Sequence, residues 1–181
     1  VYIDGVKMSD PSSVSGDFDF NNILTSHLSR VEILKGNQSS VYGSGAIGGT
    51  INIITKKGEP GLQKNFNYVT GSNKTHDLSV SLSGADEKNN FYLGLQRFQT
   101  DGISQMRHNN EKDRYRNNSI VANYGYAFNE KFEINNNLRV SETYLQYDAV
   151  SAISGYDNSE EADGVEGSYS LNFILKPIKN F

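Results

Sequence analysis

A cluster of glycines between two strand-like segments constrains the fold of this chain most strongly. In the stretch from Arg30 to Lys57, RVEILKGNQSSVYGSGAIGGTINIITKK, an alternating segment ends at Gly36. Four glycines then fall within positions 43–49, and the segment TINIIT that follows them is rich in β-branched residues. Glycines this close together indicate a backbone that turns sharply, or that other groups approach closely, between two strands.

The spacing of Gly43, Gly45 and Gly48 also fits the dinucleotide-binding fingerprint G-x-G-x-x-G. That fingerprint needs a strand before the glycines and a helix after them, with the pyrophosphate at the N-terminus of the helix. Here residues 50–55 form a β-branched segment that is a poor start for a helix, and no βαβ unit follows. The glycines are therefore predicted to be structural rather than nucleotide-binding.

The same residues resemble the end of the plug domain of TonB-dependent outer-membrane transporters. The resemblance rests on the run R-V-E-I-L-K-G-x-x-S-x-x-Y-G-x-x-A-I-G-G-x-I-N-I-I-T-K and on the upstream strand VYIDGVKM at 1–8. Within that superfamily the sequence is most similar to the cobalamin-receptor type. It departs from the pattern at Asn37, where such sequences usually carry proline. The resemblance implies that residues 1–58 are the C-terminal part of a plug, of α+β type. The polar loop at 9–22 is expected to lead into a short helical turn at roughly 21–28.

The resemblance also implies where a ligand would be bound. The loop at 9–22 and the turn at 39–45 would rise to the outer face of the plug and touch the ligand. The residues carried over on this basis are Val14, Ser15, Tyr42, Ser44 and Gly45. The alternative is that these residues only pack the plug against the barrel wall.

Charged residues on the segment before the glycines suggest a second role. Arg30, Glu32 and Lys35 lie on one predicted strand, and a solvated strand edge is the plain interpretation. Inside a barrel, whose lumen wall is polar, Arg30 and Lys35 would instead pair with acidic wall residues and act as a latch for the plug.

The pattern changes after a linker at 59–61, within the turn-forming run KKGEPG. From residue 62 onward, two-residue alternation predicts about six strands, which is clearest in DLSVSLSG at 77–84. The predicted strands are 63–70, 77–84, 90–99, 118–128, 132–140 and 168–175. Their length fits the roughly 9–11 residues that a tilted strand needs to cross a bilayer. Alternation alone also fits a soluble antiparallel sheet with one wet face.

The connections between these strands favour a barrel. The third connection (100–117) and the fifth (143–167) are predicted to be long, and the second and fourth to be tight turns. If the plug joins the barrel on the periplasmic side, both long connections lie outside the cell, as outer-membrane barrels arrange them. Plugged transporters use about 22 strands, so residues 62–181 are predicted to be an incomplete barrel. The fold class is thus mainly β, a fragment of a plugged transmembrane antiparallel β-barrel.

Composition limits the remaining possibilities. The chain has no cysteine, a formal net charge of -4 and 36% hydrophobic residues, with 11 tyrosines and 9 phenylalanines. It therefore has no disulfide framework, and it lacks the basic stripe of a nucleic-acid binder. No window of 18 or more apolar residues occurs, and no signal peptide is recognisable at residue 1, so the chain is expected to be part of a longer bacterial outer-membrane protein.

The acidic fifth connection raises the question of a metal. Carboxylates clustered on a loop are hard oxygen ligands of the kind that bind Ca²⁺, and cobalamin receptors resemble this arrangement. The candidate ligands are Asp148, Asp157 and Asp163. The alternative is a solvated acidic loop. No other cofactor is predicted.

Three functions remain in play. The first is a transporter that binds cobalamin or a ferric siderophore at the plug apex, spans outer-membrane lipid, and is driven by TonB through a segment upstream of residue 1. The second is an outer-membrane hydrolase, but the three histidines are scattered and neither H-E-x-x-H nor G-x-S-x-G occurs. The third is a soluble β adhesin or scaffold. The sequence favours the first, which is not an enzyme.

Overall fold

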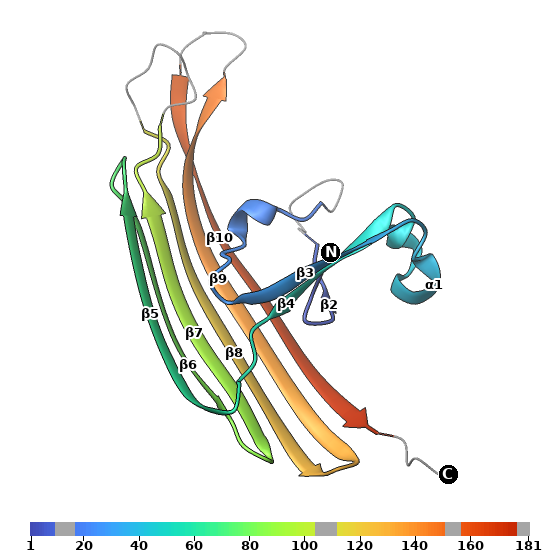
Figure 1. The fold of residues 1–181 in the computed structure, drawn as a ribbon. Coiled ribbons are helices and arrows are strands. Elements are labelled where there is room, and N and C mark those ends of the chain that lie inside the picture. The colour runs from blue at the N-terminus through green and yellow to red at the C-terminus, as the bar shows by residue number, and fades with distance from the viewer. Residues whose placement is uncertain (10–16, 104–111, 151–156, 177–181) are drawn as a thin grey trace.

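The strands of this chain form two separate sheets (Figure 1). The structure is a computed structural model and describes residues 1–9, 17–103, 112–150 and 157–176. In these ranges no helix is long and apolar enough to cross a membrane.

The first sheet, called here the small sheet, has four strands in the order β2-β1-β4-β3. They are β1 (Tyr2–Ile3), β2 (Val6–Lys7), β3 (Leu28–Lys35) and β4 (Gly49–Thr55). Asp4 and Gly5, with φ of 47° and 85°, form the turn between β1 and β2, as the Asp-Gly pair predicts. The buried core of this sheet is only Ile3, Met8 and Ile53, with a few half-buried apolar neighbours. So small a core leaves much of the sheet's stability to contacts outside it.

The glycine-rich segment between β3 and β4 is a tight structural turn, as predicted. It contains the single-turn helix α1 (Ser39–Tyr42) and the 3-10 helix η2 (Ser44–Ala46), and the chain then enters β4 directly at Gly49. Gly49 has φ of 143°, and a Cβ atom there would lie 2.5 Å from the Leu34 carbonyl oxygen. Only glycine allows this approach of the two strands.

The helical turn predicted over roughly 21–28 is present but shorter, and it begins one residue earlier. The 3-10 helix η1 covers Phe20–Asn22 only, with the Asp19 side chain accepting a hydrogen bond from the Asn21 N–H at 2.9 Å. Strand β3 begins earlier than expected because Leu28 pairs with Thr55 of β4.

The second sheet, called here the large sheet, is antiparallel and has six strands in the order of the sequence. They are β5 (Gly61–Gly71), β6 (Thr75–Ala85), β7 (Asn89–Thr100), β8 (Tyr115–Asn129), β9 (Phe132–Val150) and β10 (Asp157–Leu175). The six predicted strands are therefore confirmed, and each is longer than predicted. Strands β5, β7 and β9 end at one end of the sheet, and the two tight turns, β6–β7 and β8–β9, lie at the other (Figure 1).

The long loop predicted at 143–167 is wrong. Strand β9 continues to Val150 and β10 already starts at Asp157, with unbroken pairing from Asp157 opposite Val150 to Leu175 opposite Phe132. The alternation of apolar and polar residues is weak here because both faces of these strands carry polar side chains. Cross-strand hydrogen bonds, such as that from Gln146 Nε2 to Glu161 Oε1 at 2.9 Å, stabilise the pairing instead.

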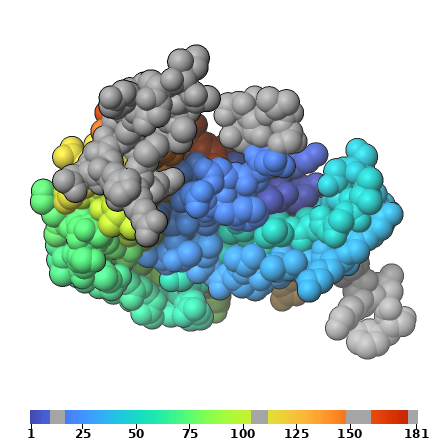
Figure 2. Space-filling model, turned by 90° about the horizontal axis from the view of Figure 1, so that it is seen from above, coloured from blue at the N-terminus to red at the C-terminus, as the bar shows by residue number. Residues whose placement is uncertain are grey.

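The large sheet reverses the polarity of a soluble protein. The small sheet covers the concave face of the large sheet (Figures 1 and 2). That face buries Ser, Asn, Gln, Thr and Arg side chains, whereas the convex face exposes large apolar ones. The buried polar set is Ser79, Ser83, Gln96, Asn117, Ser119, Asn123, Asn135, Asn137, Arg139, Ser141 and Thr143. The exposed apolar set includes Leu78, Leu82, Leu93, Leu95, Ile120, Tyr124, Leu138, Leu171 and Phe173. A polar interior with an apolar exterior is the pattern of a transmembrane barrel wall.

Candidate functional site: the contact between the two sheets

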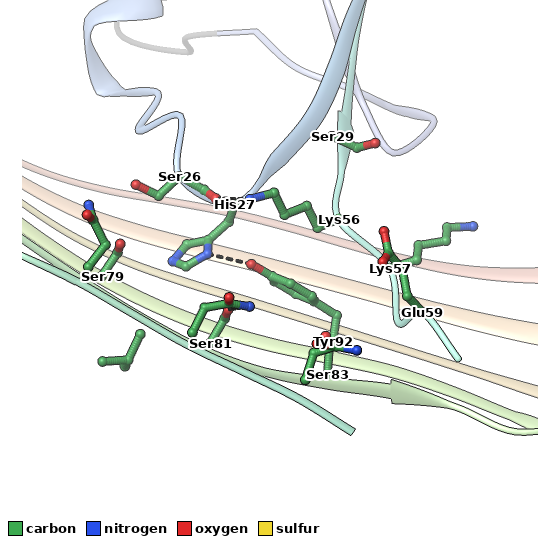
Figure 3. A pocket seen from close by; sticks show the side chains of 14 residues that line it. Ser26, His27, Ser29, Lys56, Lys57, Glu59, Ser79, Ser81, Ser83 and Tyr92 are labelled. Carbon is green, nitrogen blue, oxygen red and sulfur yellow. Dashed lines mark hydrogen bonds between the residues drawn. The ribbon is translucent and has the colours of Figure 1, made fainter. Parts of the chain in front are cut away.

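The small sheet docks on the large sheet through a histidine that enters a notch in strand β7 (Figure 3). His27, at the entrance to β3, is 3% exposed, and its Nδ1 lies 2.7 Å from the hydroxyl of Tyr92. Its ring lies against Gly94, where a Cβ atom would come within 2.4 Å of Nδ1. A glycine inside a strand is often a place of close approach, and Gly94 has that role here.

The environment of His27 favours its neutral form. Burial lowers the pKa of the imidazole, and the nearby Lys56 ammonium lowers it further, while hydrogen bonding to the Leu95 backbone and the Asp77 carboxylate oppose the shift. A neutral imidazole costs less to bury than a charged one, so the docked position of His27 is compatible with its surroundings at neutral pH.

A second contact joins strand β4 to β8 through Thr55. The side-chain amide of Asn123 donates to Thr55 Oγ1 and to the Lys56 carbonyl oxygen, each at 2.7 Å. The Thr55 hydroxyl in turn donates to the Asp4 carboxylate at 2.7 Å, and Thr55 is 1% exposed. This chain of hydrogen bonds links the β1–β2 turn, the end of β4 and the large sheet. Because these groups are buried, leaving one of them unpaired would be destabilising.

A third contact holds the 3-10 helix η1 by its carbonyl groups. Asn117 Nδ2 and Arg139 Nη2 both donate to the Asn22 carbonyl oxygen at 3.1 Å. Arg139 is almost fully buried and pairs with Glu166 of β10 at 2.8 Å. The guanidinium therefore bonds both to the large sheet, at Glu166, and to the segment before the small sheet, at Asn22. Removing it would leave a carboxylate and a carbonyl group without this donor.

A fourth contact fixes the segment between the two sheets. The Asn90 side chain accepts from the Gly58 N–H at 2.9 Å and donates to the Gly58 carbonyl oxygen at 2.7 Å. A Cβ atom on Gly58 would lie 2.1 Å from the Gly84 carbonyl oxygen, so this position also depends on glycine. The chain at Gly58 thus lies flat on strands β6 and β7.

Polar cavities remain between the two sheets. One has a volume of about 710 Å³ and lies beside His27, lined by side chains such as Lys56, Ser79 and Tyr92 (Figure 3). Another, of about 570 Å³, lies between Arg30 of β3 and the Asn135 and Asn137 side chains of β9. The interface is therefore bonded at discrete points rather than filled like an apolar core.

The residues predicted at the plug apex are only partly described. Val14 and Ser15 lie outside the described residues. Tyr42 packs its ring on Tyr2 at 5.0 Å and accepts a hydrogen bond from Asn52 at its hydroxyl group, so it has a structural role within the small sheet. Ser44 and Gly45 are exposed on η2, at the end of the small sheet farthest from the large one (Figure 1).

The predicted latch and calcium residues are dispersed. Arg30 pairs with Glu32 of its own strand at 2.7 Å, and Lys35 is exposed with no ion pair among the described residues. Asp148 and Asp157 lie in β9 and β10, although their side chains are outside the described part. Asp157 and Asp163 are six residues apart on one strand, or roughly 20 Å. No group of three possible metal ligands occurs among the residues whose side chains are described.

The docking residues His27, Gly94, Asn123 and Arg139 were not predicted from the sequence. One signal was available, since an interior glycine in the alternating segment FYLGLQRF indicates a close approach. Nothing in the sequence indicates that His27 is the group that approaches Gly94.

A curved sheet with an apolar outer face, holding a small polar-bonded sheet against its inner face, is the arrangement of a plugged β-barrel. Comparison with known proteins agrees. Residues 1–50 match the family model described as the TonB-dependent Receptor Plug Domain. The chain is 29% identical over 168 residues to curated proteins named Vitamin B12 transporter BtuB, from three strains of Vibrio cholerae serotype O1.

These matches confirm the predicted family and fold class. The chain resembles the TonB-dependent receptors, and among them the cobalamin-receptor type, and its mainly β structure agrees with part of a plugged barrel. Both matches point to a receptor or transporter rather than to an enzyme. Each match covers 90% of this chain but 27% of the relative, so the chain spans about a quarter of the length of these curated relatives.

Proposed function

We propose that the protein containing this chain is an active transporter of the bacterial outer membrane, which binds a scarce ligand and imports it with energy from the inner-membrane TonB complex. The observation that carries the proposal is the docking of the small sheet, the plug, through discrete polar contacts on the inner face of a wall with an apolar exterior. The proposed division places the plug at 1–58, the linker at 59–61 and the wall at 62–181.

The chemistry of these contacts suits a plug that must be held and then released. Each neutral hydrogen bond contributes only about 0.5–1.5 kcal/mol net, because water replaces it on separation. Release would expose Asn, Ser and Thr side chains rather than an apolar core, since the apolar face of the wall points the other way. A pull on the plug would therefore break a few local bonds without exposing a large apolar surface. Ligand binding must favour one of the two plug states for transport to be coupled.

Cobalamin is the proposed ligand, with a ferric siderophore as the alternative. Support for cobalamin comes from the relatives, which are named as vitamin B12 transporters. The proposed contacts are Val14, Ser15, Tyr42, Ser44 and Gly45 at the plug apex, with Ca²⁺ bound through Asp148, Asp157 and Asp163. Among these, the exposed Ser44 and Gly45 are free of the packing contacts that hold Tyr42.

Ligand binding by the full-length protein in detergent tests this proposal. Cyanocobalamin is expected to bind tightly and ferric enterobactin weakly, and uptake by cells is expected to require TonB. Ser44→Trp should weaken binding by more than tenfold, because it fills the proposed contact, whereas Val165→Trp, on the exposed outer face of β10, should leave it unchanged. Preference for the siderophore would reject cobalamin, and uptake without TonB would reject the energy coupling.

The latch and the metal need separate tests. Arg30→Glu should loosen the plug if Arg30 pairs with a wall carboxylate, and Lys64→Glu, on the outer face of β5, is the matched control. Cyanocobalamin binding measured with Ca²⁺ and with a chelator tests the metal. Equal affinity in the two conditions would reject a calcium role.

A further inference from the structure

The turn between β1 and β2 carries a carboxylate that the turn itself does not use. Asp4 and Gly5 both have positive φ, as a two-residue hairpin turn requires, and asparagine or glycine at position 4 would meet that requirement as well. In many turns an aspartate side chain bonds the backbone of its own turn. Here both carboxylate oxygens of Asp4 accept from Thr55 of β4 instead, one from the backbone N–H at 3.0 Å and the other from the hydroxyl at 2.7 Å. The carboxylate therefore has a partner 51 positions away that the geometry of the turn does not explain.

The Asp4 carboxylate decides how the Thr55 hydroxyl is bonded. A carboxylate only accepts hydrogen bonds, so Asp4 takes up the one hydroxyl hydrogen of Thr55. The Thr55 oxygen then offers a lone pair to the side-chain amide of Asn123 on β8, whose nitrogen lies 2.7 Å away. Asn123 Oδ1 is buried and has no partner among the described residues, so the Asn123 side chain bonds the plug through its NH2 group. Asp4 thus keeps Thr55 in the acceptor orientation that the wall requires.

The backbone of Asp4 ties the β1–β2 hairpin to both sheets. Its N–H donates to the Ile53 carbonyl oxygen of β4 at 3.0 Å, and its own carbonyl oxygen accepts from the Ser170 hydroxyl of β10 at 3.4 Å. The hairpin accordingly extends from the small sheet towards the large one (Figure 1). One residue therefore links the hairpin, the end of β4 and the wall.

The β1–β2 hairpin is the part of the small sheet with the fewest backbone pairs. Strand β1 pairs two residues with β2 and two with β4, whereas β3 pairs with β4 at seven positions. Short elements with few pairs separate at lower free energy than long ones. Under a pull on the chain that leads into β1, the hairpin should therefore separate from β4 before β3 does.

We infer that Asp4 is a positioning residue that couples the β1–β2 hairpin to the docking of the plug. While the hairpin is paired with β4, the Asp4 carboxylate holds Thr55 as the acceptor for Asn123. When the hairpin is pulled away, the carboxylate leaves with it, and the buried Thr55 hydroxyl loses its acceptor at the contact with the wall. A pull on the hairpin thereby weakens a contact that is not itself pulled. The inference rests on the proposed function, in which the pull reaches the plug through the chain before β1.

Substitutions at position 4 that keep the turn test this inference. Glycine and asparagine both tolerate positive φ, so Asp4→Gly and Asp4→Asn remove the carboxylate without removing the hairpin. Hydrogen–deuterium exchange of the full-length protein in detergent is measured for β3, whose pairing with β4 does not involve Asp4. Both variants should speed this exchange by about tenfold, as expected for the loss of a buried hydrogen bond. Asp86→Asn is the matched control, because the Asp86 carboxylate bonds the backbone of its own turn at Lys88 and Asn89.

A double-mutant cycle separates positioning from a general loss of stability. In an Asn123→Ala background the wall donor is absent, so Asp4→Gly should have little further effect on β3 exchange. Wild-type exchange in both Asp4 variants would overturn the inference, because the turn alone would then account for docking. An equal effect of Asp4→Gly with and without the Asn123 side chain would also overturn it.

The proposed function is tested separately from this coupling. The exchange measurement needs neither TonB nor a ligand, so a negative result concerns the role of Asp4 alone. The proposed function fails instead if cells that carry the wild-type protein take up cobalamin without TonB.

Discussion

Replacing Gly94 by alanine should loosen the plug from the wall, because it fills the notch that receives His27. An added Cβ would lie 2.4 Å from Nδ1, 2.6 Å from Cε1 and 2.8 Å from Cγ of that ring. These are atoms of a rigid ring rather than the end of a flexible chain, so the imidazole must move as a unit. Such a move also breaks the 2.7 Å hydrogen bond to Tyr92.

The expected cost can be estimated from two terms. Overpacking of a filled site costs about 1–3 kcal/mol, and the lost hydrogen bond adds about 0.5–1.5 kcal/mol. A total of roughly 2–4 kcal/mol lowers the ratio of docked to released plug by roughly 30- to 1000-fold. The wall itself should be little affected, because Gly94 keeps its strand pairing with Val121 and Ser81.

Hydrogen–deuterium exchange of the full-length protein in detergent measures this effect. Peptides from β3 and β4 should exchange much faster in Gly94→Ala, while peptides from β9 keep their protection. Gly164→Ala is the matched control, because an added Cβ there meets Thr143 at an ordinary 3.7 Å.

A double-mutant cycle identifies the cause. In a His27→Ala background the ring is absent, so Gly94→Ala should have little further effect. Unchanged exchange of β3 and β4 in Gly94→Ala, or additive effects in the double variant, would refute the proposed role of the notch.

Three further outcomes follow from the docking contacts. Burial lowers the pKa of His27, so the released imidazole, with a pKa near 6.5, takes up a proton first as the pH falls. Docking of the plug should therefore weaken from about pH 6.5 downward and be constant above it. An equal increase of β3 exchange at low pH in His27→Gln would contradict this. Asn123→Ala should cost about 1–3 kcal/mol by leaving buried partners unpaired, seen as a lower urea midpoint for plug release; an unchanged midpoint would reject it. Arg139→Met should lower the stability of the docked protein by about 3 kcal/mol, mainly because it leaves the Glu166 carboxylate without its partner. R139M/E166M should recover part of this loss. A double variant less stable than Arg139→Met would reject this account.

The sequence predicted the large sheet well because its alternation has a simple physical cause. Leu78, Val80 and Leu82 face one way and the intervening serines the other, and this period survives in any strand with two different surroundings. The prediction failed at residues 157–167, where both faces of β10 are polar and the period carries no information. Strand pairing with β9, a long-range effect, determines the structure there.

The docking contacts were harder to predict, because they join residues that are far apart in the sequence. His27 and Tyr92 are separated by 65 positions, and Asn22 and Arg139 by 117. Gly94 marks a close approach but does not identify the approaching group, and Asn123 looks like any other polar residue of an alternating strand. Pairing of this kind depends on how the two sheets are set against each other, which local patterns do not encode.

The clamp of Asn90 on Gly58 has a kinetic consequence for a displaced plug. Only residues 56–60 separate β4 from β5, so the end of the plug cannot move more than about 20 Å from its attachment even if the clamp opens. A tether this short holds the detached plug at an effective concentration in the millimolar range beside its own docking surface. Each excursion is then an intramolecular event, and the plug reseats itself once the pull ends without having to search for its site.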